Sequence, residues 1–315
     1  MSALANRFMG QTLHFMGAFV EARVHLERTL EICAANQETI ASYRRFGTDD
    51  QANTLTFLAV TLFLLGYPEK SSVVAEQAVS RARALGHAFT TALTLSHLAV
   101  LGIIGGDPQL ALAKADEAIA ISVENEFAGT HHRARFFRGA LLAQDDDPQR
   151  GIELMRNAMA AAEGNSERNR RTVYLCHAAM AHARLGEPDV SLGLLNEALQ
   201  IVETTGERFF EAELYRLRGL ALLGLGKTSE AEAELRRALM VAQQQGARWW
   251  ELRAAVSLAE LLRDEGRYAD ACSVLKPVFD WFVEGFDRPD LKHAKVLLDQ
   301  LNCLASPQTQ AVQKY

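Results

Sequence analysis

Hydrophobic positions along the chain recur at the three-and-four spacing of amphipathic helices. In residues 206–246 one apolar series, which includes Leu214, runs up to a turn centred on Gly226. A second series resumes after the turn, where Ala231 and Leu235 share one helical face. Because glycine readily forms the turn between two such series, the pattern predicts a hairpin of two helices.

The same hairpin pattern repeats along almost the whole chain. From Gly226, steps of forty residues reach equivalent turn residues at Gly266, Gly186, Asp146, Gly106 and Gly66. A fixed period of this length is the signature of a solenoid, in which each unit buries its apolar face against its neighbours. Strand patterns bounded by turn residues are not evident, so the predicted fold class is all-α: an α-solenoid of about seven helical hairpins with a period of about forty residues.

The period divides the chain into one predicted superhelical domain, residues 1–303, with a flexible tail at 304–315. A capping helix is predicted at 289–303, where it covers the last hairpin. The seven hairpins are predicted at approximately 1–36, 51–86, 87–126, 127–165, 166–206, 207–246 and 247–284.

Small residues occupy one position of every unit. Seven residues before each turn stand Gly10, Ala59, Ala99, Gly139, Ala179, Gly219 and Ala259. A small residue there allows the two helices of a hairpin to cross closely. Ala231, on the opposing helix, has the same role, so a larger residue at position 231 is expected to cost about 1–3 kcal/mol.

Three polar segments interrupt or border the pattern. The polar segment Asn36–Asn53 lengthens one step from 40 to 49 residues, and we favour a tolerated loop over a binding insertion there. The acidic run Asp145–Asp147 precedes Pro148 and is interpreted as a helix cap, not a metal cluster. The basic run Glu167–Arg171 is interpreted as a solvated rim.

Composition narrows the possible environments and partners. The formal net charge of −6 argues against nucleic-acid binding, which usually requires a basic face. The longest apolar stretch, Leu55–Leu65, is too short to span a bilayer, and no signal peptide opens the chain, so no membrane partner is expected. The 4 cysteines have no paired spacing and suit a reducing cytoplasm. The first hairpin has no polar cap before it, which makes self-association a further expectation.

No motif for catalysis, a metal or a cofactor emerges. The segment Gly224–Thr228 resembles part of a phosphate-binding loop, but the additional glycine required by that motif is replaced by Ala221 and no strand precedes it. The adjacent His131 and His132 point about 100° apart on a helix and cannot share a metal without other ligands. We therefore expect no enzyme activity, no cofactor and no metal.

The repeat resembles the tetratricopeptide repeat. The small and apolar signature positions of that family are matched by Gly219, Gly226, Ala231, Leu235 and Ala238, although its usual period is thirty-four residues. This resemblance implies a right-handed superhelix that acts as a scaffold.

A narrower resemblance is to the C-terminal repeat arm of bacterial signalling proteins that carry a nucleotide cyclase or winged-helix domain and a predicted STAND-type ATPase. The segments that carry it are 43–50, 64–68, 206–219 and 281–291. It implies a regulatory domain in bacterial, cytoplasmic signal transduction.

In such arrays the first helix of each hairpin lines a concave groove, which implies a set of candidate binding positions. They are Val60, Phe63, Val100, Ile103, Phe136, Met180, Arg216, Leu220, Leu223, Arg253 and Glu260. An apolar groove of this kind suits a peptide or helix of a protein partner. Two alternatives stay open: the array curls tightly enough to bury this face, or the chain is a small-molecule-sensing arm that controls an ATPase, cyclase or transcriptional output.

Aromatic pairs stand at equivalent places of two neighbouring units. Phe209-Phe210 follow Arg208, and Trp249-Trp250 follow Arg248 forty residues later. A stacked ladder that captures a ligand is one interpretation, and packing in the core is the one we favour.

Overall fold

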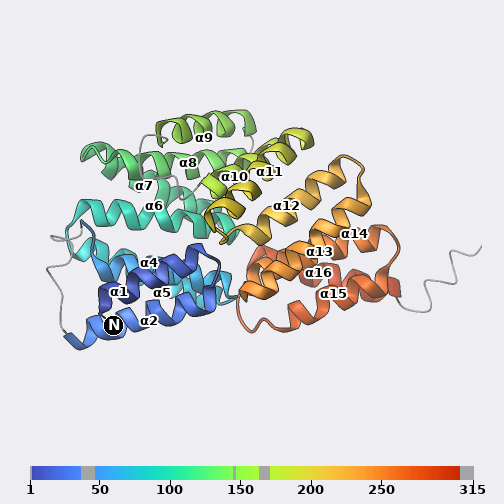
Figure 1. Ribbon diagram of the computed structural model, residues 1–315, viewed down its shortest axis with the longest axis horizontal. Helices are drawn as coiled ribbons and strands as arrows, with labels where there is room; N and C mark the ends of the chain where they lie inside the picture. The colour runs from blue at the N-terminus through green and yellow to red at the C-terminus, as the bar shows by residue number, and fades with distance from the viewer. Residues whose placement is uncertain (1, 37–46, 145–146, 163–170, 306–315) are drawn as a thin grey trace, which may run out of the picture.

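The computed structural model describes residues 2–36, 47–144, 147–162 and 171–305, and these residues form fifteen helices and no strand. In chain order the helices are α1 (Ala3–Phe15), α2 (Phe19–Asn36), α4 (Asp50–Leu64), α5 (Pro68–Ala84), α6 (Ala88–Ile104), α7 (Pro108–Glu124), α8 (Ala128–Gln144), α9 (Pro148–Ala162), α10 (Arg171–Arg184), α11 (Pro188–Thr205), α12 (Glu211–Gly224), α13 (Thr228–Gln245), α14 (Arg248–Asp264), α15 (Tyr268–Asp280) and α16 (Pro289–Ala305). Consecutive helices pack as antiparallel pairs, and the pairs stack into a curved solenoid (Figure 1). The predicted all-α solenoid is confirmed.

Proline and aspartate define the starts of the second helices of several hairpins. Pro68, Pro108 and Pro188 occupy the first turns of α5, α7 and α11, where the missing N–H of proline leaves no hydrogen bond unmade. The Asp147 carboxylate accepts a hydrogen bond of 3.1 Å from the backbone N–H of Arg150, which confirms a capping role for this aspartate. Residues 145 and 146 of the same acidic run fall outside the described residues.

The helices of a hairpin cross closely at the small residues. A Cβ atom added to Gly219 would lie 2.8 Å from Cγ of Leu235, and one added to Gly10 would lie 2.7 Å from Cγ of Leu26. Ala231, on the facing helix, is fully buried. The close crossing predicted from the sequence is therefore confirmed, and any side chain at position 219 would meet the partner helix.

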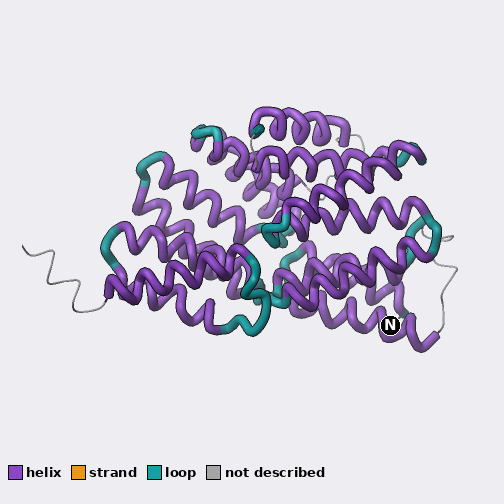
Figure 2. Tube along the Cα trace, turned by 180° about the vertical axis from the view of Figure 1, so that it is seen from behind, coloured by secondary structure: helices purple, strands orange, loops and turns teal. Residues whose placement is uncertain are grey.

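The superhelix closes on itself. A Cβ atom at Gly17 would lie 2.5 Å from Gln245, one at Gly66 would lie 2.6 Å from Trp281, and one at Gly106 would lie 2.8 Å from a proline at the start of α16. The turn glycines of later hairpins have no such cover: a Cβ atom would meet nothing within 4 Å at Gly186, Gly226 and Gly266. The turns of the first three hairpins thus dock on the C-terminal half, and Figure 2 shows these loops converging in the middle of the molecule.

Three kinds of contact hold this junction, which we call the seam. The backbone N–H of Arg208 donates a hydrogen bond of 2.7 Å to the carbonyl of Phe15. The Glu284 carboxylate accepts one of 2.9 Å from the backbone N–H of Glu69, at the start of α5. The rings of Phe63 on α4 and Trp249 on α14 lie with their centroids 4.5 Å apart. The seam therefore joins segments that are roughly two hundred residues apart in the sequence.

The outer face of the first hairpin carries exposed apolar side chains. Phe8, Met16, Val20 and Val24 are between 50% and 61% exposed. Self-association through this face stays a prediction. Residues 37–46 of the predicted loop, 167–170 of the basic run and 306–315 of the predicted tail lie outside the described residues. The described parts differ from the prediction, because residues 50–53 of the loop belong to α4 and residues 304–305 of the tail belong to α16.

Candidate functional site

The eleven predicted groove residues fall into two regions. In the N-terminal half, closure of the superhelix packs inward-facing side chains into the hydrophobic core, where Val60, Phe63, Val100, Ile103 and Phe136 are all at least 92% buried. Leu223 is partly buried against the same core. In the C-terminal half, the structure brings the remaining five together around one cleft: Met180, Arg216, Leu220, Arg253 and Glu260.

This hollow, which we call the C-terminal cleft, lies between α10, α12, α14 and α16. Its volume is about 260 Å³. The residues that complete its lining, and that the sequence analysis did not select, are Leu252, Val256, Ser257, Asp290 and His293. Met180, Leu220, Leu252 and Val256 supply apolar surface, while the other six lining residues are charged or polar.

A ladder of ion pairs crosses the cleft from one inner helix to the next. Glu213 on α12 accepts two hydrogen bonds of 2.7 Å from the guanidinium of Arg216. Arg253 on α14 lies 3.3 Å from the Glu213 carboxylate and donates a hydrogen bond of 2.8 Å to Asp290 on α16. The side chain of Glu213 is 2% exposed, so it forms the buried end of the ladder.

The two arginines determine the charge state of the buried carboxyl. Burial alone would raise the pKa of Glu213, but the charges of Arg216 and Arg253 and their hydrogen bonds outweigh it and lower this pKa to about 2. Burial opposes the charge of Arg253, and Asp290 and Glu213 more than compensate, which raises its pKa. Glu213 and Arg253 are therefore both ionised throughout the physiological pH range.

The mouth of the cleft carries a second, more exposed pair. Nε2 of His293 on α16 lies 3.0 Å from the Glu260 carboxylate on α14. The side chain of Glu260 is 34% exposed and that of His293 is 56% exposed, whereas Arg216 and Arg253 are only 12% and 17% exposed. Carboxylate, not guanidinium, is thus the more accessible charged group of the cleft.

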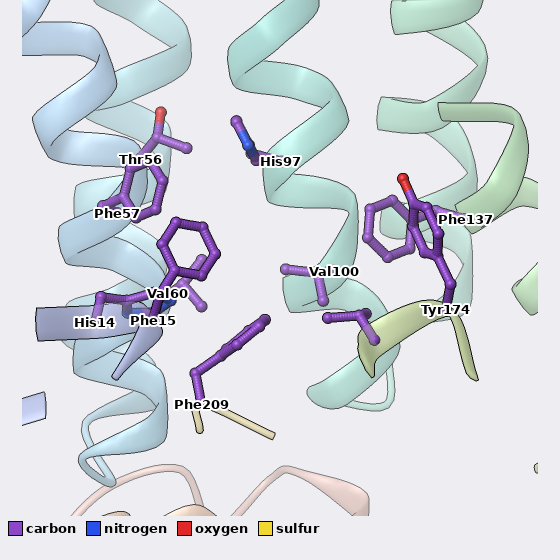
Figure 3. A pocket seen from close by; sticks show the side chains of 11 residues that line it. His14, Phe15, Thr56, Phe57, Val60, His97, Val100, Phe137, Tyr174 and Phe209 are labelled. Atoms are coloured by element: carbon purple, nitrogen blue, oxygen red, sulfur yellow. The ribbon is translucent and has the colours of Figure 1, made fainter. Parts of the chain in front are cut away.

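A second, smaller cavity lies inside the closed superhelix, mainly between helices of the N-terminal half. Figure 3 shows side chains from α1, α4, α6, α8 and α10, together with Phe209, pointing into it. Its volume is about 30 Å³, which is space for about two water molecules. Two predicted groove residues, Val60 and Val100, contribute to its lining. The cavity is a small packing void of a largely aromatic core.

A buried histidine lies among the rings of the aromatic core. His177 on α10 packs against the rings of Phe136, Phe137 and Phe210. Neither of its ring nitrogens has a hydrogen-bond partner among the described residues. Burial, as the largest cause, lowers the pKa of His177 to about 4, so the imidazole is neutral at pH 7.

The aromatic pairs selected from the sequence belong to the core. Phe209, Phe210, Trp249 and Trp250 are each at most 5% exposed, which confirms packing as their interpretation. The arginines beside them form equivalent ion pairs forty residues apart: Arg208 lies 2.9 Å from Glu211, and Arg248 lies 2.6 Å from Glu251.

Within the described ranges, no group of three or more His, Cys, Asp or Glu side chains is placed to hold a metal ion. The turn around Gly226 joins the end of α12 to the start of α13 and follows a helix, not a strand. Among the helices that the structure describes, none has the length and apolar character to cross a membrane.

Sequence comparisons identify a repeat family and one relative. The model of the tetratricopeptide repeat family matches residues 252–277. An uncharacterized protein of Rhizobium meliloti is 25% identical over 223 residues, which are 68% of this chain and 21% of that protein. The chain therefore spans about a fifth of the length of the curated relative it matches.

Solved structures with low sequence identity share the fold. A Rap protein complexed with competence and sporulation factor has a TM-score of 0.60 at 14% identity, over 95% of this chain and 80% of that one. A Rap conjugation gene regulator of the plasmid pLS20, in complex with the Phr peptide, has a TM-score of 0.53 at 11% identity, over 97% and 98%. A tetratricopeptide repeat protein from Parabacteroides merdae has a TM-score of 0.50 at 16% identity, over 95% and 98%.

Proposed function

We propose that this chain, which has the fold of tetratricopeptide-repeat proteins, is a non-catalytic module that binds a peptide segment of a partner protein in the C-terminal cleft. The observation that carries the proposal is the division of the concave face. Closure of the superhelix packs the N-terminal part of that face into the core, while the cleft between α10, α12, α14 and α16 stays open.

The composition of the cleft suits a peptide. Apolar surface from Leu220 and Val256 lies beside polar groups from Ser257, Asp290 and Glu260. Peptide-binding grooves combine these features, because apolar pockets take side chains and polar groups fix the orientation of the chain. The complex of a Rap regulator with the Phr peptide is a precedent for peptide binding on a similar fold.

The wider role that we propose is that of a regulatory scaffold in bacterial cytoplasmic signalling. Its support is the sequence resemblance to the repeat arms of cyclase and STAND-type ATPase proteins. The alternative role, a small-molecule-sensing arm, has less structural support, because the aromatic cavity offers only about 30 Å³.

The test is to capture partners from the host by crosslinking and affinity purification, read out by mass spectrometry. Leu220→Glu adds a charge to the cleft at a side chain that is 37% exposed, whereas Met240→Glu makes a matched change at a 49% exposed side chain on α13, outside the cleft. We expect a partner that is retained by the wild type and by Met240→Glu and lost from Leu220→Glu, with all three proteins equally helical by circular dichroism. A partner set that does not respond to Leu220→Glu would contradict binding in the cleft.

A further inference from the structure

The positive charges of the C-terminal cleft are already neutralised by groups of the protein itself. Arg216 donates two hydrogen bonds to Glu213 and one of 3.2 Å to Ser257. Arg253 binds Asp290 and Glu213, and it also donates a hydrogen bond of 2.8 Å to the carbonyl of Ile104. An anionic ligand group would have to displace a carboxylate from a buried guanidinium and leave that carboxylate without its partner, which is unfavourable.

The accessible charge of the cleft is negative. Three carboxylates, those of Glu213, Glu260 and Asp290, stand in or beside it against two guanidinium groups, which gives an excess of one negative charge with histidine counted as neutral. The excess negative charge lies on the solvent side of the cleft and not at the buried Glu213. The side chains of Glu260 and Asp290 are 34% and 29% exposed. A cation that approaches from solvent therefore meets carboxylate first.

Apolar surface adjoins these carboxylates. Leu220 and Glu260 occupy equivalent positions forty residues apart on the neighbouring inner helices α12 and α14, and both line the cleft with Val256. Leu220 is 37% exposed although it belongs to the concave face. The methylene stem of a lysine or arginine packs on such surface while its charged end stays at the polar rim.

From these three observations we infer that the C-terminal cleft selects a peptide with a lysine or arginine side chain, whose stem lies on Leu220 and Val256 and whose charge is held by Glu260 and Asp290. This inference rests on the proposed function and specifies the chemistry of its ligand. It also assigns His293 a role as the resident partner of Glu260 that the ligand displaces.

The experiment uses three pools of nine-residue peptides with capped ends, which differ only at the central position: lysine, norleucine or glutamate. The other eight positions carry one equimolar mixture of Ala, Leu, Phe, Gln and Ser, so the pools are matched in everything but the central side chain. Retention on the immobilised full chain is measured for the wild type, Glu260→Gln and Glu230→Gln. Glu230 lies on α13 with 61% of its side chain exposed and does not line the cleft.

We expect the wild type to retain the lysine pool at least fivefold more than the norleucine pool, and the glutamate pool least. Glu260→Gln is expected to reduce the lysine preference to within twofold, while Glu230→Gln keeps it. Equal retention of the lysine and norleucine pools, or preference for glutamate, would overturn the selectivity for a cation and leave peptide binding intact. Retention of every pool at the level of the matrix without protein would overturn the proposed function as well.

Discussion

Arg253 donates a hydrogen bond of 2.8 Å to the carbonyl of Ile104, a residue 149 positions earlier in the chain. The same guanidinium binds Glu213 and Asp290, which belong to the ion-pair ladder of the C-terminal cleft. One side chain therefore takes part both in the seam that closes the superhelix and in the cleft that we propose as the binding site. Because buried ionic networks are sensitive to the loss of one partner, the geometry of the cleft depends on the closed state.

The buried Glu213 makes the stability of the protein depend on acid pH. Its pKa falls from 4.5 to about 2 on folding, so the unfolded chain takes up the proton first as the pH decreases. The resulting stabilisation, about 3 kcal/mol, is complete above pH 4.5 and is lost between pH 4.5 and 2. Urea unfolding at several pH values is expected to show a smaller loss over this interval for Glu213→Gln. An identical pH slope in the variant would contradict the ionised ladder.

His177 acts over a different pH interval. Its pKa falls from 6.5 to about 4, so the unfolded state again binds the proton more readily and stability decreases as the pH falls from 6.5 to 4. In His177→Leu we expect this slope to disappear. We also expect a gain of about 1 kcal/mol or more at pH 7, because both unpartnered ring nitrogens are removed from a buried site. A variant that is less stable than the wild type and keeps the same pH dependence would contradict an unpartnered, buried imidazole at position 177.

The close crossing of helices can be tested with two glycines in helices. At Gly219 a Cβ atom would lie 2.8 Å from Leu235, whereas at Gly193 on α11 it would meet nothing within 4 Å. Gly219→Ala is therefore expected to lose about 1–3 kcal/mol in unfolding free energy through overpacking. The matched change Gly193→Ala is expected to gain about 0.5–1 kcal/mol, because alanine is the better helix former. Equal effects of the two changes on the midpoint of thermal unfolding would argue against the crossing.

The local features of the fold could be predicted from the sequence because each depends on residues that are close in the chain. Helix periodicity, glycine turns and the small position typified by Gly219 are properties of a single unit, and the period of forty repeats them. The capping helix was expected from the segment after Pro289. Tight curling of the superhelix could be stated only as one of two alternatives for the inner face. The choice between them depends on a small rotation per unit, which accumulates over the array and cannot be read from a single repeat.

The candidate site was predictable only in part for the same reason. Arg216, Arg253 and Glu260 were selected as inward-facing, but the closure that buries Phe63 and leaves Leu220 exposed was not visible in the pattern. The pairing of Glu213 with Arg253 could have been predicted from the sequence, because the two residues are one period of forty apart and lie on the neighbouring inner helices α12 and α14. Asp290 and His293 were missed because α16 follows the last full unit and lies outside the period.

The seam itself can be tested with two turn glycines of similar, left-handed backbone conformation. Gly66 has φ of +89° and Gly226 has φ of +74°, so an alanine at either position bears the cost of the left-handed region, about 1–2 kcal/mol. Only Gly66 is covered: a Cβ atom there would lie 2.6 Å from the ring of Trp281 and 2.8 Å from Cβ of Arg248.

Gly66→Ala must therefore move Trp281 and Arg248, and we expect it to lose about 1–3 kcal/mol more than Gly226→Ala. If opening of the seam relieves the strain, small-angle scattering will show a larger radius of gyration for Gly66→Ala at unchanged helix content. The tryptophan emission will also shift to the red, because rings at the seam become hydrated. Gly226→Ala is expected to keep the wild-type radius. Identical stability and radius for the two variants would mean that the turn of the second hairpin does not dock on the C-terminal half in solution.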